Sequence, residues 1–173
     1  ALAKKDGSCS IFTEAEGNGF FCGIKSITVA VNGKSDDQCI TAIGSPKEFE
    51  HILSDQTIVK YGYDLKLQSN ILRYNGIALE GKLMDIELMH YLINPEKSHK
   101  IEILARTYLN INLEDSAPAA EEAQPLSLFD EVPAESSENT DHHPEVAATL
   151  LIGERVHEEM KSMNLCHLYE TME

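Results

Sequence analysis

The clearest structural pattern in the chain lies in residues 63–113, YDLKLQSNILRYNGIALEGKLMDIELMHYLINPEKSHKIEILARTYLNINL. Three helical patterns follow one another there, because apolar residues recur at intervals of three and four. These positions are Leu65, Ile71 and Leu72, then Ile86, Met89, Leu92 and Ile93, and then Ile101, Leu104, Ala105, Tyr108 and Leu109. Asn75-Gly76 is a typical stop for the first helix, and Asn94-Pro95 ends the second. Between them, residues 77–84 are mostly apolar and bounded by glycines, which makes them a candidate strand.

The residues before this stretch predict strands first. Residues 9–12, 24–31 and 38–43 are β-prone runs, and Asn32-Gly33 is a type I′ hairpin signal between the last two. Ser45 and Pro46 then suit the N-cap and the first position of a helix, and residues 57–61 form a short strand of the buried type. An antiparallel three-stranded meander followed by parallel strands that alternate with helices predicts an α/β fold, a mixed sheet flanked by helices.

The residues after this stretch fall into two parts. Residues 114–144 contain four of the six prolines, and residues 114–145 contain ten acidic residues and no basic one, which predicts a flexible acidic segment. A helical pattern returns at residues 146–163, and residues 165–172 begin a further helix; the candidate core positions are Ala147, Leu150, Leu151 and Val156. We therefore expect an α/β core at residues 1–113, a flexible segment at 114–144 and C-terminal helices at 145–173 that complete the domain.

Composition limits the function. The net charge is −15, there is no tryptophan, and no basic stripe is visible, so a large phosphate-binding surface is not expected. No apolar run approaches the roughly 20 residues of a membrane helix, and residues 1–10 do not form a secretory signal, so we expect a cytoplasmic protein without a membrane partner. The cysteines lack zinc-site spacing and predict free thiols: Cys9, Cys22, Cys39 and Cys166. Because the chain does not begin with Met, we expect a piece of a longer protein.

Four segments of this chain resemble a known family in their order and spacing. They are Asp64-Leu65-Lys66-Leu67-Gln68, Asn75-Gly76-Ile77, Met84-Asp85-Ile86-Glu87-Leu88-Met89-His90-Tyr91-Leu92-Ile93-Asn94-Pro95 and Ile101-Glu102-Ile103-Leu104-Ala105-Arg106-Thr107-Tyr108-Leu109. The family is the 3′–5′ exonuclease-like domain of bacterial DNA polymerase I, a family A polymerase. The resemblance implies a ribonuclease H-like fold, and it implies that residues 145–173 lead toward a polymerase domain of the same chain.

The resemblance also says where catalytic carboxylates would stand. Active members hold two divalent metals with four carboxylates, and the metals stabilise the charge that develops as a phosphodiester is cut. The Asp-x-Glu motif matches Phe12-Thr13-Glu14, so the aspartate position is Phe12. The second aspartate position is Gln68, although Lys66 is kept. The third motif, Tyr-x-x-x-Asp, falls near residues 144–149, which hold neither residue, and Asp141 is a poor substitute in the polar run before them.

At most one of the four carboxylates, Glu14, is therefore present. We expect a catalytically inactive, vestigial proofreading domain that serves as a scaffold in a polymerase of DNA replication and repair, with no cofactor and with DNA bound only weakly or through the intact polymerase. Two alternatives are an active exonuclease that uses Mg or Mn, and a non-cutting guide for single-stranded DNA. Asp64 and Asp85 are interpreted as structural, because an aspartate suits a helix N-terminus, and His142-His143 as polar residues of the acidic segment.

One apolar island stands inside the acidic segment. Gln124, Leu126, Ser127, Leu128 and Phe129 resemble the short peptides with which bacterial proteins bind the sliding clamp, with Pro125 inserted after the glutamine. The resemblance implies the clamp as a partner in the bacterial cytoplasm, near the nucleoid. The alternative is that the island docks on its own domain or has no role.

Overall fold

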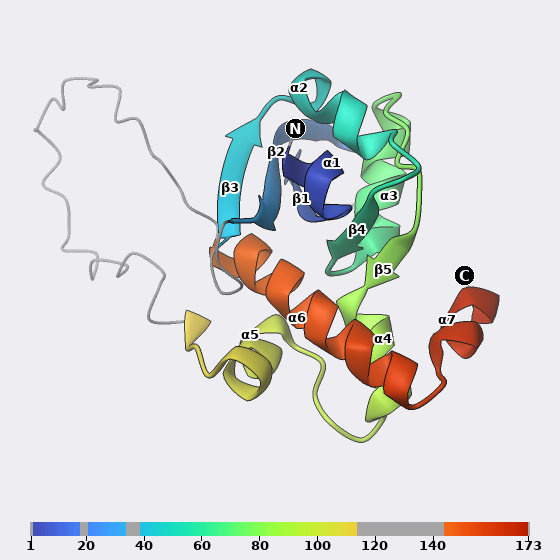
Figure 1. Ribbon diagram of the computed structural model, residues 1–173. Helices are drawn as coiled ribbons and strands as arrows, with labels where there is room; N and C mark the ends of the chain where they lie inside the picture. The colour runs from blue at the N-terminus through green and yellow to red at the C-terminus, as the bar shows by residue number, and fades with distance from the viewer. Residues whose placement is uncertain (1, 18–20, 34–38, 114–143, 173) are drawn as a thin grey trace, which may run out of the picture.

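The computed structural model describes residues 2–17, 21–33, 39–113 and 144–172. Within these ranges five strands form one sheet in the order β3-β2-β1-β4-β5 (Figure 1). They are β1 (Ser8–Glu16), β2 (Gly23–Asn32), β3 (Cys39–Gly44), β4 (Val59–Gly62) and β5 (Leu83–Asp85). β1, β2 and β3 pair antiparallel, whereas β4 runs parallel to both β1 and β5. The predicted mixed sheet, a meander followed by parallel strands, is confirmed.

Helices cover both faces of this sheet (Figure 1). On one face lie α1 (Leu2–Asp6), α2 (Pro46–Leu53) and α3 (Leu65–Tyr74). On the other face lie α4 (Ile86–Ile93), α5 (Ile101–Leu104), the π-helical turn η1 (Ala105–Leu109), α6 (Pro144–Ser162) and α7 (Cys166–Met172). The long helix α6 crosses the sheet diagonally, and α7 lies beside the β5 edge.

The alternation of side chains in the strands divides the interior into two apolar clusters. In β2, Ile27, Val29 and Val31 pack with Ile11 and Leu72 under α1, α2 and α3. The opposite face of the sheet meets α6, and there the contacts are partly polar. For example, Ser8 Oγ and Asn32 Nδ2 both donate to Glu154 Oε1, each at 2.9 Å.

Local sequence signals explain several helix ends. Ser45 and Glu48 form a capping box at α2, with Pro46 at the first helical position, as predicted. α3 ends where Asn75-Gly76 predicts, and Gly76 has a φ of +75°, a conformation that favours glycine. α4 ends before Asn94-Pro95, also as predicted.

One expectation for the strands is wrong, and one strand and one helix form differently from the prediction. A two-residue turn at Asn32-Gly33 would pair residue 31 with residue 34, but Asn32 pairs with Cys39. Only the end of residues 77–84 forms a strand, β5, because pairing with the short β4 supports just three residues. The third helical pattern is continuous in sequence, yet its second half is a π-helical turn, in which Tyr108 Oη donates to Glu159 Oε2 at 2.8 Å.

Two details of burial also differ from the prediction. Ala147 and Leu151 are only half-buried, whereas Val146, Ala148, Ile152 and Gly153 of the same helix are buried. Leu150 and Val156 are buried as predicted. In the predicted buried strand at residues 57–61, Lys60 is fully buried, and its Nζ donates to the backbone oxygens of Asp55 and Glu80.

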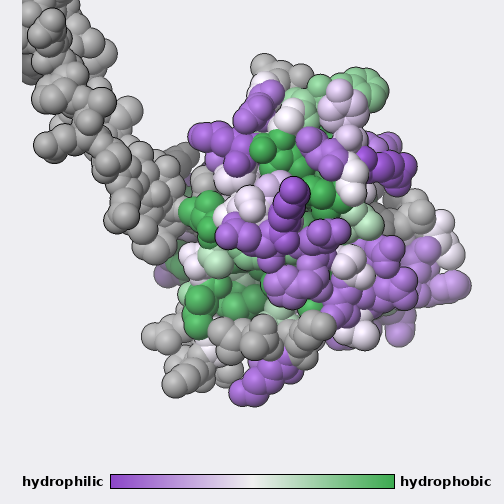
Figure 2. Space-filling view, turned by 90° about the horizontal axis from the view of Figure 1, so that it is seen from above, coloured by the Kyte–Doolittle hydropathy of each residue, from purple (hydrophilic) through white to green (hydrophobic). Residues whose placement is uncertain are grey.

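The face shown in Figure 2 mixes hydrophobic and hydrophilic side chains, and the predicted thiols can be located in the structure. Seen from above, hydrophobic side chains form separate patches between hydrophilic ones (Figure 2). In the described part of the chain, no helix has the length and apolar character needed to cross a membrane. None of the four cysteines forms a disulfide, as predicted, and Cys9 and Cys22 are buried whereas Cys39 and Cys166 are half-buried.

Candidate functional site

The central strand β1 carries the first two motif positions. Residues 8, 10, 12 and 14 alternate onto the face that α6 covers, and Ser10 Oγ donates to Val146 O of α6 at 2.5 Å. Phe12 and Glu14 therefore lie just beyond the N-terminal end of α6. The structure brings the region matched to the third motif, residues 144–149, close to the first motif, as a ribonuclease H-like site requires.

Phe12 makes this part of the site apolar. It is 37% exposed and pairs across the sheet with Thr28, which pairs in turn with Ile43 of β3. Thr28, the middle residue of these three cross-strand neighbours, is buried, and its Oγ1 has no hydrogen-bond partner. An aromatic ring supplies no ligand to a hard divalent cation, which requires oxygen atoms.

Glu14 has its carboxylate occupied by groups of the neighbouring strand. Its two oxygens accept from Lys25 Nζ at 2.7 Å and from Ser26 Oγ at 2.9 Å. The charge of Glu14 is therefore balanced by a protein cation on the partly exposed surface of the sheet.

Gln68 is the best-defined residue of the site. It is 4% exposed, its Oε1 accepts from Thr13 N at 3.1 Å, and its Nε2 donates to Tyr63 O at 2.7 Å. The amide thus joins β1 to the residue before the N-cap of α3. A carboxylate could accept the first hydrogen bond but could not donate the second, so this position suits an amide better than a metal ligand.

The third motif region, residues 144–149, holds no aspartate, and its one carboxylate, Glu145, is exposed. Thr149 is buried, and its Oγ1 donates to Glu145 O within α6 at 2.8 Å. Asp141 and His142-His143 lie outside the described residues, as does the island Gln124–Phe129. Among the residues that are described, no three His, Cys, Asp or Glu side chains gather in a way that could hold a metal ion.

Asp64 and Asp85 are structural, as interpreted. Asp64 caps α3 by accepting from Leu67 N, and Asp85 caps α4 by accepting from Glu87 N and Leu88 N. Asp85 also accepts from Leu65 N at 2.7 Å, so one buried carboxylate joins the first turns of two helices. Burial raises the pKa of Asp85 to about 6, and the backbone N–H groups oppose this rise.

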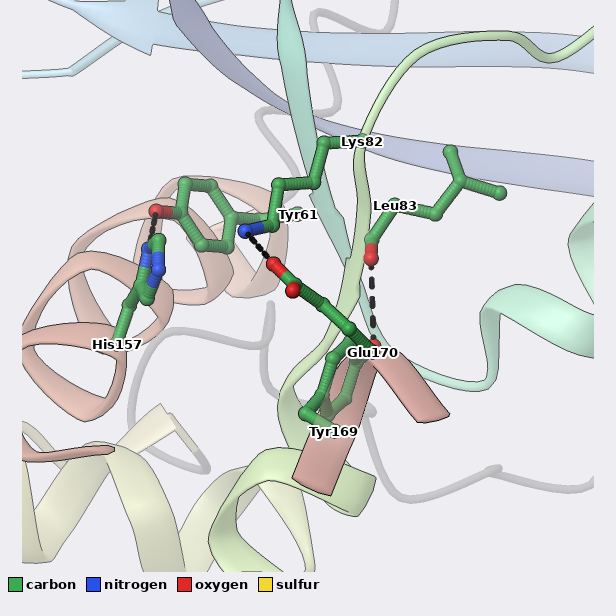
Figure 3. Close-up of polar contacts among 6 residues, drawn as sticks. All are labelled: Tyr61, Lys82, Leu83, His157, Tyr169 and Glu170. Carbon is green, nitrogen blue, oxygen red and sulfur yellow. Dashed lines mark hydrogen bonds and ion pairs between the residues drawn. The ribbon is translucent and has the colours of Figure 1, made fainter. Parts of the chain in front are cut away.

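A second polar cluster ties α6 and α7 to the parallel strands (Figure 3). We call it the clasp; its residues are Tyr61, Lys82, Leu83, His157, Tyr169 and Glu170. Tyr61 Oη and His157 Nδ1 are 2.9 Å apart, and Lys82 Nζ lies 2.9 Å from Glu170 Oε1. Tyr169 Oη accepts from Asp85 N at 2.8 Å and donates to Leu83 O at 3.3 Å. Burial lowers the pKa of His157, which favours the neutral ring beside Tyr61.

The clasp also depends on close packing. A Cβ atom on Gly153 of α6 would lie 2.5 Å from the ring of Tyr61, so glycine lets the helix approach β4. Sequence reasoning missed the clasp, because the side chains that meet in it stand on separate elements. The one available signal is the helical pattern of residues 165–172, which includes Tyr169.

The sheet order, the helical layers and the placement of the motif positions at the end of β1 define a ribonuclease H-like exonuclease fold. The sequence model of the family described as DNA polymerase I, ribonuclease H-like domain, matches residues 28–116. The chain therefore belongs to this family and is a DNA polymerase I exonuclease-like domain. No curated protein sequence matches it.

Solved structures share this fold at low sequence identity. The POL domain of Pol1 from M. smegmatis, in complex with DNA primer-template and dNTP, is 15% identical over 91% of this chain and 24% of that chain, with a TM-score of 0.58. Brucella melitensis NrnC is 12% identical over 98% and 81% of the two chains, with a TM-score of 0.65. Escherichia coli RNase D, an exoribonuclease, is 13% identical over 95% and 42%, with a TM-score of 0.62. This chain thus spans about a quarter of the mycobacterial polymerase chain.

Proposed function

We propose that this domain is a catalytically inactive proofreading module that serves as a structural scaffold within a cytoplasmic DNA polymerase I of DNA replication and repair. The observation that carries the proposal is the state of Gln68. Its buried amide is hydrogen-bonded at both ends, to Thr13 N and to Tyr63 O, at a position where the active family holds a metal carboxylate. Phe12 supplies no ligand, and Glu14 is held by Lys25 and Ser26.

The scaffold role rests on the clasp and on the kinship with polymerase chains. The clasp fixes α6 and α7 against β4 and β5, and family members continue from this region into a polymerase domain. The polymerase domain of the same chain is therefore the proposed partner, and DNA would be bound only weakly by this domain or through the intact polymerase.

The experiment is a titration of the domain with Mn²⁺, combined with a degradation assay on a single-stranded oligonucleotide labelled at its 5′ end. We expect no saturable metal binding and no shortening from the 3′ end, in Mn²⁺ or in Mg²⁺. Binding near two metals per chain together with shortening would overturn the proposal and favour an active exonuclease. Escherichia coli RNase D, a solved nuclease of the same fold, serves as the positive control on an RNA oligonucleotide.

The sliding clamp is a second proposed partner, through Gln124, Leu126, Ser127, Leu128 and Phe129. The support is the resemblance of this peptide to clamp-binding motifs, in which an apolar pair fills a clamp pocket. A labelled peptide of residues 120–133 should bind a bacterial clamp, and the same peptide with Leu128→Ala and Phe129→Ala should not. Equal binding of both peptides would exclude this mode.

A further inference from the structure

An exposed aromatic pair lies at the C-terminal end of α3, where Phe21, from the segment before β2, meets Tyr74, the last residue of the helix. Phe21 is 82% exposed and Tyr74 is 59% exposed, and their ring centroids are 5.5 Å apart in an edge-to-face arrangement. The chain near Phe21 is held against α3 because Asn75 Nδ2 donates to Cys22 O at 2.9 Å. The two rings are therefore positioned by the fold, although water reaches both of them.

Polar and basic side chains continue from these rings along the same helix. Asn70 and Arg73 line one surface hollow together with Phe21 and Tyr74. Lys66, Ser69, Asn70 and Arg73 line the adjoining hollow. These positions are three, four and seven residues apart and share one face of α3, so Lys66 and Arg73 stand about 10 Å apart at a rise of 1.5 Å per residue.

The charge of this face differs from that of the whole chain, which is strongly acidic. Within the described residues, neither Lys66 nor Arg73 forms an ion pair. The carboxylate that reaches the same hollow, Asp85, is buried and uses both oxygens on backbone N–H groups. Glu80 lies near Arg73 at the far end, where it accepts from Gln56 Nε2.

We propose that Phe21, Lys66, Asn70, Arg73 and Tyr74, here called the α3 patch, bind a short segment of single-stranded nucleic acid. A base would stack on the exposed rings, and phosphates would follow Arg73 and Lys66 along the helix. Nucleic acid has bases that can stack on the exposed rings and phosphates that can pair with the two cations. An acidic peptide would interact only with the cations.

The α3 patch is separate from the motif positions Phe12 and Glu14. It shares α3 with Gln68, but the side chain of Gln68 is buried and hydrogen-bonded to β1. α3 packs on the sheet face opposite to α6, whereas Phe12 and Glu14 face the α6 side. The inference therefore does not rest on the proposed loss of catalysis. The α3 patch would bind nucleic acid without cleaving it.

The test is fluorescence anisotropy with a labelled 12-nucleotide single strand, at low salt and with EDTA present, so that metal-dependent catalysis plays no part. Phe21→Ala with Tyr74→Ala, and separately Arg73→Glu, should each weaken binding by about tenfold or more, since stacking and phosphate contacts are lost. All these side chains are partly or largely exposed, and circular dichroism would show that the variants fold.

Two matched controls make the result specific. Tyr91→Ala removes an exposed tyrosine of α4, and Lys47→Glu reverses an exposed charge of α2; both should leave binding within about twofold of the unaltered domain. The proposal is overturned if the oligonucleotide does not bind saturably, or if Lys47→Glu weakens binding as much as Arg73→Glu. It is also overturned if a synthetic peptide of residues 114–143 binds through Arg73 while the oligonucleotide does not.

Discussion

The matched motif positions and the clasp differ in how their polar groups are used. Gln68 is bonded to β1 and to the turn before α3, and Glu14 is bonded to β2. Among the residues that the structure describes, no three His, Cys, Asp or Glu side chains gather there to hold a metal. In the clasp, Tyr61 and Tyr169 join strands to helices that lie 96 and 84 residues away in sequence. Under the proposed function, the difference means that this sequence keeps the packing of an exonuclease fold without its catalytic carboxylates.

The strongest test of the clasp is Tyr169→Ala. Tyr169 is 3% exposed, so removing its ring should lower the free energy of unfolding by about 3–5 kcal/mol. Tyr169→Phe keeps the ring but leaves Asp85 N without its acceptor, so it should cost about 1–3 kcal/mol. Urea unfolding measures both. If Tyr169→Ala changed nothing, α7 would not be docked in solution and the contrast between the two regions would fail.

Asp85, next to the clasp, should make stability depend on pH. Its folded pKa of about 6 lies above the ordinary value of 3.8, so the native state binds the proton more tightly. The protonated Asp85 side chain therefore adds to the free energy of unfolding below pH 4, and this added stability is lost as pH rises through 6. At about 1.4 kcal/mol per pKa unit, the loss amounts to about 3 kcal/mol.

The measurement is the difference in unfolding free energy between the unaltered domain and Asp85→Asn at several pH values, because contributions of the histidines cancel in that difference. Asp85→Asn carries a constant penalty from unmatched N–H donors, and only the slope between pH 4 and 6 is diagnostic. If the difference in unfolding free energy did not change with pH, the three N–H donors would lower the pKa of Asp85 at least as much as burial raises it.

At the motif site, Gln68→Glu should also be unfavourable. The new carboxylate cannot donate to Tyr63 O and would be buried, so the expected cost at pH 7 is about 1–3 kcal/mol. Gln56→Glu makes the same change at an exposed side chain. It places a carboxylate beside Glu80, and because exposed charges interact weakly it should cost less than about 1 kcal/mol. If Gln68→Glu were neutral in urea unfolding and the variant bound Mn²⁺, the remaining residues around position 68 would still supply metal ligands, contrary to the proposal.

The smallest effect is expected for Lys82→Ala. Lys82 and Glu170 are both well exposed, and ion pairs between exposed side chains contribute little. We expect the thermal unfolding midpoint to stay unchanged within error. A clear decrease, abolished at high salt, would show that electrostatics adds to the clasp beyond the contacts of Tyr169.

Much of the fold could be predicted because the helical periods and the helix stop signals depend on residues that are close in sequence. The meander, α3 with its Asn75-Gly76 end and α4 with its Asn94-Pro95 end all depend on neighbouring residues. The errors arose where tertiary contacts decide. Strand pairing shortens β5, and packing on the sheet selects which residues of α6 are buried.

The site was predictable only in part. Matching the motifs predicts that Phe12, Glu14 and Gln68 stand where the family holds carboxylates, and the structure places the first two on β1 and the third on α3. The two hydrogen bonds of Gln68 could not be predicted, because Thr13 and Tyr63 come from a different strand and from a turn. The same holds for the α3 patch, since Phe21 and Tyr74 are 53 residues apart in sequence and meet only in the folded chain.

The hydrogen bond from Ser10 to Val146 joins residues 136 positions apart, and it has a consequence for biosynthesis. The sheet face above β1 stays uncovered until α6 has been made. At about 5–20 residues per second, translation needs roughly 2–10 s to extend the chain from residue 113 to residue 162. During that interval the nascent chain exposes apolar residues such as Ile86 and Met89, and it is then a natural substrate for chaperones on the ribosome.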